Sequence, residues 1–217
     1  MSRSKPNAIL IYGGWEGHEP AAFARRFGDA LEGLGYVLTR ADSLDVLDDV
    51  ERLAQADLIV PFWTMGELSG QREKNLNHVV RAGTGLGGIH GGMGDAFRGS
   101  LEYEWMVGGH FVGHPHVGPY SVRVTRPEHP VVEGLPGRFD YDSEQYYMLI
   151  DPAVEVLAAT TYRHDGREVD MPVIWTRNWG RGRVFYSALG HVMAEFEKYP
   201  HVLEATLRGL QWATRQS

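Results

Sequence analysis

The sequence of 217 residues contains no cysteine. This absence excludes disulfide bonds, metal sites built on thiolates and catalysis by a cysteine nucleophile. The formal net charge of −7 provides no excess of basic residues, which a nucleic-acid interface requires. No stretch approaches the roughly 20 consecutive apolar residues of a membrane span. The composition therefore predicts neither a nucleic-acid partner nor a membrane-spanning segment.

The start of the chain shows no export signal. Residues 1–7 are mostly polar and lead into a short apolar run, shorter than the roughly 7–15 residues of a secretory signal. We therefore expect a cytoplasmic protein. The hydrophobic content of 43% and charged content of 23% are those of an ordinary globular protein. Because no repeat, linker or low-complexity tract divides the chain, we expect one domain over residues 1–217.

The first ninety residues alternate between apolar runs and segments of helical spacing. Strands are predicted at residues 8–12, 36–39, 57–62 and 85–89, and helices at residues 20–34, 44–53 and 67–82. This alternation is typical of a doubly wound α/β fold with a parallel sheet. Ligands of such folds bind beyond the carboxyl ends of the strands.

The pattern changes after residue 93. A stretch rich in glycine, histidine and aromatic residues follows, with one short helix expected at 101–107. Strands are then predicted at residues 121–125, 144–150, 154–161, 171–175 and 183–189, and an amphipathic helix at 202–213. We interpret these strands as an antiparallel extension and a return to the main sheet. The predicted fold class is therefore α/β, with a mainly parallel sheet and an antiparallel extension in the C-terminal half.

The most informative residue is His90, in the run Gly87-Gly88-Ile89-His90-Gly91-Gly92. An apolar strand precedes it, and glycines two residues before and after allow a sharp strand-to-helix turn. This resembles the nucleophile elbow of the G-x-S-x-G motif, which presents its central side chain above the sheet. An imidazole presented there can carry protons or bind a metal. The alternative is a histidine packed in the core.

Two further histidines follow predicted strands, His18 after the first strand and His191 after the last. Because strand ends meet at one edge of a parallel sheet, we expect His18, His90 and His191 to converge. Three neutral imidazoles can bind a divalent metal such as zinc and leave one position open. Alternatively, one imidazole acts as a base while another polarises a carbonyl. The loop before His18 lacks the G-x-G-x-x-G of a dinucleotide site.

Other residues are candidates for the same site. Glu144 and Tyr146 are two positions apart, so a strand places them on one face, where they are suited to proton transfer or to binding sugar hydroxyls. The alternative is an exposed edge strand. Trp15, Trp63 and Trp175 offer apolar faces to a sugar ring, although core packing explains tryptophans equally well.

A second histidine cluster comprises His110, His114 and His116. The glycines and the proline between them disfavour a helical H-x-x-x-H site, and H-E-x-x-H is absent. We therefore interpret His114-Pro115 as a loop anchor and the cluster as a weaker metal candidate. The apolar and aromatic residues of 110–120 would either cover the ligand-binding crevice at the carboxyl ends of the strands or contact a second subunit in a homo-oligomer. The sequence leaves both open.

Several motifs spread over most of the chain carry a family resemblance: Gly88-Ile89-His90, Gly108 to Pro115, His129-Pro130 with Gly134-Leu135, Glu144 with Tyr146, Pro172 to Trp175, and Gly180 to His191. In these motifs the chain resembles the ThuA-like (trehalose-utilisation) family, a branch of the class I glutamine amidotransferase-like superfamily. The resemblance implies a flavodoxin-like three-layer α/β/α sandwich. It also implies a role in carbohydrate metabolism.

The resemblance places His90 where amidotransferases carry the cysteine that attacks glutamine. His191 stands at a place similar to that of their catalytic histidine. Pro-Glu follows that histidine in amidotransferases, whereas Val192 and Met193 follow here and Glu195 lies further on. Without a cysteine, glutamine hydrolysis by the thiol route is excluded.

Three functions remain as hypotheses. The first is an enzyme acting on a small carbohydrate such as a 3-keto-sugar, in which His90 removes a proton next to the carbonyl. His18, His191 or a bound metal would then stabilise the enediolate. The second is a non-catalytic sugar-binding or regulatory module, in which the histidines need not be aligned; nitrogens of His18, His90 and His191 more than about 10 Å apart would favour it. The third is a metal-dependent hydrolase.

Overall fold

The computed structural model describes residues 5–216 of the chain. The strands are β1 (Asn7–Gly14), β2 (Val37–Ala41), β3 (Leu58–Thr64), β4 (Gly85–Ile89), β5 (Gly109–Val124), β6 (Arg138–Ile150), β7 (Glu155–His164), β8 (Arg167–Trp179) and β9 (Gly182–Ser187). The helices are α1 (Pro20–Gly33), α2 (Val50–Gln55), α3 (Gly70–Arg81), α4 (His90–Gly94), α5 (Leu101–Val107), α6 (Met193–Lys198) and α7 (Pro200–Ala213). Two short 3-10 helices are η1 (Glu16–His18) and η2 (Leu44–Asp48).

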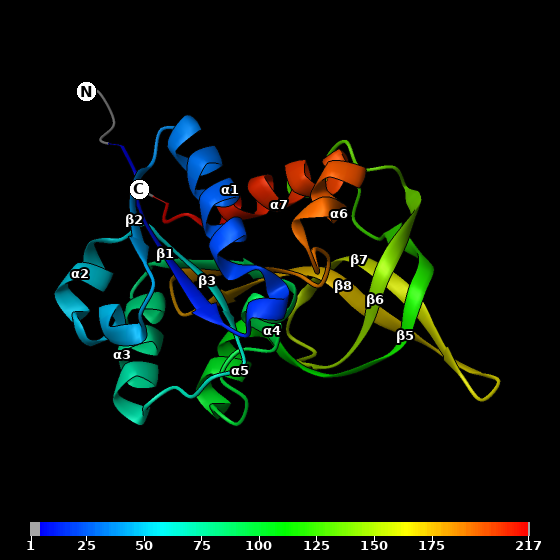
Figure 1. Ribbon diagram of the computed structural model, residues 1–217, viewed down its shortest axis with the longest axis horizontal. Coiled ribbons are helices and arrows are strands. Elements are labelled where there is room, and N and C mark those ends of the chain that lie inside the picture. The colour runs from blue at the N-terminus through cyan, green and yellow to red at the C-terminus, as the bar shows by residue number, and fades with distance from the viewer. Residues whose placement is uncertain (1–4, 217) are drawn as a thin grey trace.

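Within the described residues, the strands form one nine-stranded sheet in the order β2-β1-β3-β4-β9-β8-β7-β5-β6. Figure 1 shows helices on both sides of this sheet, with α1, α6 and α7 on one side and α2, α3 and α5 on the other. The arrangement confirms the predicted α/β class and its three layers.

The half of the sheet formed by β2, β1, β3, β4 and β9 is parallel. The pairs β1–β2, β1–β3, β3–β4 and β4–β9 all run in the same direction. Their order is that of flavodoxin-like folds, with β9 in the fifth place. The order reverses between β1 and β3, which is where such folds bind ligands, beyond the carboxyl ends of the strands. The runs Ile9-Leu10-Ile11 and Leu58-Ile59-Val60 are buried, as expected for strands covered on both faces.

The remaining strands form the antiparallel extension. β8 pairs with β9, β7 with β8, and β5 with both β6 and β7. We expected residues 93–118 to be irregular apart from one short helix. This prediction is wrong for residues 109–118, which belong to the long strand β5. Their glycines and Pro115 have low strand propensity, but β6 supplies a partner strand, and irregularities between Phe111 and His116 accommodate the sequence.

Capping side chains explain where two helices differ from their predicted limits. The helix expected at 44–53 divides into η2 and α2, because the side chain of Asp49 accepts a bond from Arg52 N and begins a second helix. The helix expected at 67–82 begins at Gly70, where Ser69 provides the cap. The C-terminal helix is confirmed, with Leu203 and Leu210 buried as predicted. Helix α6 was not predicted.

No helix within residues 5–216 combines the length and the apolar character needed to cross a bilayer.

A buried ion pair anchors α5 to the extension. The Arg177 guanidinium of β8 contacts the Asp151 carboxylate at 2.7 Å and the backbone carbonyl of Trp105 at 2.6 Å. The side chains of Arg177 and Asp151 are only 7% and 10% exposed. Removal of one partner therefore leaves a buried charge without compensation.

We expect Arg177→Ala to lower the free energy of unfolding by about 3–5 kcal/mol, measured by urea denaturation. Arg163→Ala is the matched control, because the Arg163–Glu168 pair on β7 and β8 is 70% and 56% exposed. Its loss should cost at most about 1 kcal/mol. Equal effects of the two substitutions would contradict a structural role for the buried pair.

Candidate functional site

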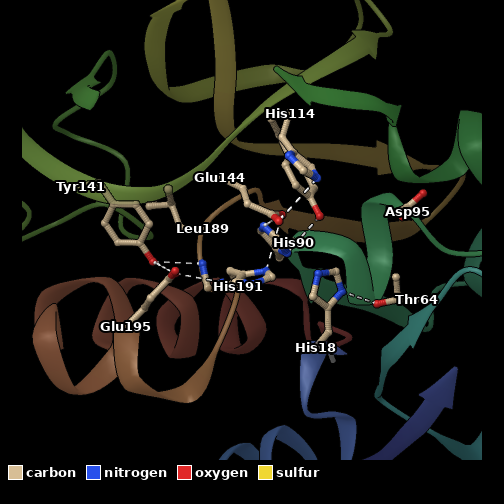
Figure 2. A network of polar contacts seen from close by, with 12 residues as sticks. His18, Thr64, His90, Asp95, His114, Tyr141, Glu144, Leu189, His191 and Glu195 are labelled. Atoms are coloured by element: carbon tan, nitrogen blue, oxygen red, sulfur yellow. Dashed lines mark hydrogen bonds and ion pairs between the residues drawn. The ribbon is translucent and has the colours of Figure 1, made fainter. Parts of the chain in front are cut away.

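Four side chains from distant parts of the chain converge at the carboxyl edge of the parallel strands. His18, His90, Glu144 and His191 each offer one nitrogen or oxygen atom, and these four atoms lie within 4.8 Å of one another. Figure 2 shows the three imidazoles gathered around the end of the Glu144 side chain. We call these four residues the histidine–glutamate cluster.

His90 stands on the turn between β4 and α4, as the glycine pattern predicted. Its φ of +42° is a strained conformation for a residue with a side chain, as in a nucleophile elbow. The Tyr186 hydroxyl donates a hydrogen bond of 3.1 Å to the His90 carbonyl. A Cβ on Gly88 would lie 2.8 Å from Met93 Cβ, so the glycine permits the close packing of this turn. The histidine is 2% exposed.

His18 reaches the cluster from η1, just beyond β1. Its Nδ1 forms a hydrogen bond of 2.7 Å with the Thr64 hydroxyl at the end of β3. A Cβ on Gly91 would collide with the His18 ring, so the absence of a side chain there lets the ring approach His90. The ring centroids of His18 and His90 are 4.9 Å apart. The loop that precedes α1 therefore delivers an oriented imidazole.

His191 follows β9 through Gly190, whose φ of +99° favours glycine. His191 Nδ1 lies 3.5 Å from Glu144 Oε2, and its ring centroid lies 5.0 Å from that of His18. The predicted convergence of His18, His90 and His191 therefore matches the geometry. The strand-end rule for parallel sheets accounts for it.

Strand β6 contributes Glu144 and Tyr146, which both reach His90. Glu144 Oε2 is 3.5 Å from His90 Nε2 and from His191 Nδ1. The Tyr146 hydroxyl forms a hydrogen bond of 3.0 Å with His90 Nδ1. β6 is the last strand of the sheet, so it is an edge strand as the alternative interpretation held, yet these two side chains turn inward.

Two nitrogens of the cluster are buried without a hydrogen-bond partner among the described residues, His90 Nε2 and His191 Nδ1. Burial lowers the pKa of the His90 imidazole well below its ordinary value, and the neighbouring histidines lower it further. Burial, together with His191 and His114, lowers the pKa of His18 from 6.5 to about 4. Both imidazoles are therefore neutral near pH 7, with a lone pair available for a proton or a metal ion.

The second histidine cluster does not assemble. His110 Nδ1 lies 3.2 Å from Glu104, and His116 Nε2 lies 3.2 Å from the Pro119 carbonyl. His114 instead reaches the histidine–glutamate cluster, with its Nε2 3.4 Å from Glu144 Oε1. Its interpretation as a loop anchor is wrong, because the irregular part of β5 directs its ring toward Glu144.

The three tryptophans lie in different surroundings. Trp15 is 47% exposed and packs edge-on against His18, with ring centroids 4.8 Å apart. Trp63 is half-buried and lies against the backbone of Gly13 and Gly66. Trp175 is fully buried and donates its indole N–H to the Val107 carbonyl at 2.9 Å. The structure therefore places Trp175 in the core, away from any ligand, and only Trp15 beside the cluster with an accessible ring.

Sequence reasoning missed Thr64, Tyr141 and the contacts of Glu195. Thr64 ends a parallel strand, so the rule that placed His18 and His90 at the sheet edge could have included it. Tyr141 carries no such signal, because its contact with Glu195 depends on the tertiary contact between β6 and α6. For Glu195, the sequence indicated only that an acidic residue follows His191 by four positions, not which atoms it contacts.

We expect Gly91→Ala to displace the His18 ring while the protein stays folded, because alanine suits a helical position but its Cβ would overlap that ring. The measurement is the ¹⁵N NMR spectrum of the histidine rings, in which the His18 signals should shift most. Gly113→Ala is the control, since no atom lies within 4 Å of its added Cβ. An unchanged His18 signal in Gly91→Ala would show that the ring is not confined.

Solved structures share this fold over nearly the whole chain. A ThuA-like protein from Bacteroides uniformis has a TM-score of 0.79 at 20% identity, covering 98% of this chain and 94% of that one. A ThuA-like protein from Parabacteroides merdae has a TM-score of 0.74 at 19% identity, covering 99% and 93%. A β-galactosidase from Bacillus circulans has a TM-score of 0.60 at 14% identity, covering 98% of this chain but 32% of the enzyme.

No curated protein sequence matches the chain. A family model, ThuA, described as trehalose utilisation, matches residues 8–213. The match includes all four residues of the histidine–glutamate cluster and every strand from β2 to β9. The chain therefore belongs to the ThuA family, whose description links it to carbohydrate use.

Proposed function

We propose that the protein is a carbohydrate-active enzyme that transfers a proton next to a sugar carbonyl, as in a 3-keto-sugar, at a divalent metal held by the histidine–glutamate cluster. One observation carries the proposal. Two buried imidazole nitrogens, of His90 and His191, lack hydrogen-bond partners among the described residues and face the same oxygen of Glu144. Buried polar atoms are normally paired, so unpaired nitrogens that converge on a carboxylate point to an absent shared partner.

The donor set fits a transition metal. Three imidazoles and one carboxylate are ligands that zinc and related divalent ions accept, at about 2.0–2.2 Å. Ligand atoms around a tetrahedral ion lie about 3.4 Å apart, a separation that follows from those bond lengths. The four atoms here, within 4.8 Å of one another, need only small shifts to close on an ion.

Outer contacts orient the ligands as they do in known metal sites. The Nδ1 of His18 bonds to Thr64 and the Nδ1 of His90 bonds to Tyr146, which leaves Nε2 of each ring for the ion. Burial raises the pKa of the Tyr146 hydroxyl well above its ordinary value, so this hydroxyl keeps its proton near pH 7. Nε2 of His90 has a lone pair for the ion in the tautomer whose Nδ1–H donates to the Tyr146 oxygen.

A bound divalent ion would polarise the sugar carbonyl and so acidify the neighbouring C–H group. In that arrangement His114 is the imidazole left to move the proton, because it contacts the far oxygen of Glu144 and its side chain is 40% exposed. The accessible ring of Trp15, beside His18, offers an apolar face on which a sugar can stack. A cytoplasmic location belongs to this proposal, and a structural neighbour from Salmonella typhimurium is itself described as cytoplasmic.

The hydrogen bond between Tyr146 and His90 Nδ1 favours a second candidate, the same proton transfer without a metal. Neutral His90, oriented by Tyr146, would then act as the base. A non-catalytic sugar-binding module receives less support, since it does not need ring nitrogens this close together.

We expect protein produced without a histidine tag to bind about one equivalent of Zn²⁺, measured by elemental analysis after loading and desalting. His90→Ala and Glu144→Gln should each lose most of this metal. His78→Ala is the matched control, because His78 is an exposed histidine of α3 outside the cluster. Less than about a tenth of an equivalent in the loaded wild-type protein would contradict the metal centre and leave the metal-free candidate.

We expect the enzyme to exchange the proton next to the carbonyl of 3-keto-glucosides for deuterium in D₂O, followed by ¹H NMR. His90→Ala should slow this exchange by at least about 100-fold with little change in melting temperature, whether His90 holds a metal or acts as the base. Release of a sugar fragment would indicate a hydrolase instead. Saturable sugar binding with neither exchange nor product would indicate a binding module.

A further inference from the structure

A second buried carboxylate, Glu195, lies beside the cluster but contributes no atom to it. Glu195 belongs to the first turn of α6 and is 8% exposed. Its Oε2 accepts a hydrogen bond of 2.6 Å from the Tyr141 hydroxyl and one of 2.9 Å from the backbone N–H of His191. Figure 2 shows this pair on the side of His191 that faces away from His18.

Tyr141 completes a closed set of contacts around the turn that follows β9. Its hydroxyl donates to Glu195 and accepts a hydrogen bond of 3.1 Å from Gly190 N. Burial and the nearby Glu195 raise the pKa of this hydroxyl well above its ordinary value, so it remains a donor. The two successive N–H groups of Gly190 and His191 are thus both held by the Tyr141–Glu195 pair.

Gly190 itself contributes no side chain that could fix the direction of the turn. Gly190 adopts a φ of +99°, and a Cβ there would collide with the Phe196 ring, so the position has no side chain to restrict it. Glycine is the most permissive residue for backbone conformation. The two N–H contacts therefore help to fix how the chain leaves β9 and where the His191 ring is directed.

We propose that Glu195 and Tyr141 form a positioning pair, which holds the Gly190–His191 turn so that His191 Nδ1 faces Glu144. The inference rests on the proposed function only in taking the histidine–glutamate cluster as the working centre. A buried carboxylate is costly unless it is fully hydrogen-bonded, and here the groups that bond it belong to the turn and to β6. Tyr141 and Glu144 lie on the same strand, so β6 places the carboxylate and also holds the histidine opposite it.

The test compares Co²⁺ affinity and the visible spectrum of the Co²⁺-loaded protein among variants. We expect Glu195→Ala to weaken Co²⁺ binding about 10- to 100-fold and to alter the spectrum, as loss of an outer contact does at metal sites. Glu195→Gln keeps an oxygen that accepts both hydrogen bonds, so it should bind within about threefold of the wild-type protein. If Glu195→Ala does not fold, Tyr141→Phe should show a smaller weakening in the same direction.

Glu73→Ala is the matched control. The Glu73 carboxylate also accepts a bond from a distant backbone N–H, that of Tyr103 at 3.1 Å, but it lies outside the cluster. Its removal should leave Co²⁺ affinity unchanged. Wild-type affinity and spectrum in folded Glu195→Ala would overturn the positioning role, and so would equal losses in Glu195→Ala and Glu195→Gln.

Failure of the metal proposal is recognised separately, as absence of Co²⁺ binding by the wild-type protein. The positioning role is then measured in the metal-free protein by the ¹⁵N signals of the His191 ring. Glu195→Ala should shift them, whereas Glu195→Gln and Glu73→Ala should leave them in place. Unshifted His191 signals in Glu195→Ala would overturn the proposal.

Discussion

The contact between Glu144 and the imidazoles of His90 and His191 joins the two halves of the sheet. The histidines stand at the ends of parallel strands, whereas Glu144 comes from β6, the last strand of the antiparallel extension. The extension must therefore curve back over the parallel half to bring this carboxylate into place. The same curvature brings Tyr146 to His90 and His114 to Glu144. Without it, three imidazoles would face one another with no carboxylate between them.

The parallel half was predictable because local sequence determines it. Continuous apolar runs such as Ile9-Leu10-Ile11 mark strands covered on both faces, and the strand-end rule then places His18, His90 and His191 together. The elbow at His90 follows from small residues that only a close backbone approach requires. The antiparallel half was harder to predict because it depends on pairing between distant segments. β5 is a strand because β6 lies beside it. Trp175 was a candidate for binding a sugar ring, yet it packs in the core.

Family membership describes the fold of this protein, whereas its chemistry depends on the side chains at the site. The fold is shared with ThuA-like proteins and with part of a β-galactosidase, at identities of 20% and 14%. A shared fold at such identities does not specify a reaction, because function resides in particular side chains. In this chain the elbow presents His90. Glu195, the acidic residue that follows His191 in the sequence, contacts the backbone N–H of His191 and not its ring. An imidazole at the elbow is chemically suited to proton transfer or metal ligation.

The distance along the chain between His18 and His191 has a consequence for assembly. Residues so far apart in sequence meet only after the intervening loop has closed, and the entropy of that closure is recovered by the packed sheet. The proposed ion would not organise the polypeptide, in contrast to a zinc finger, whose ligands lie close together in sequence. The cluster is therefore complete only once β9, one of the last elements to be synthesised, has inserted beside β4. The proposed ion would therefore bind late in the biogenesis of the protein.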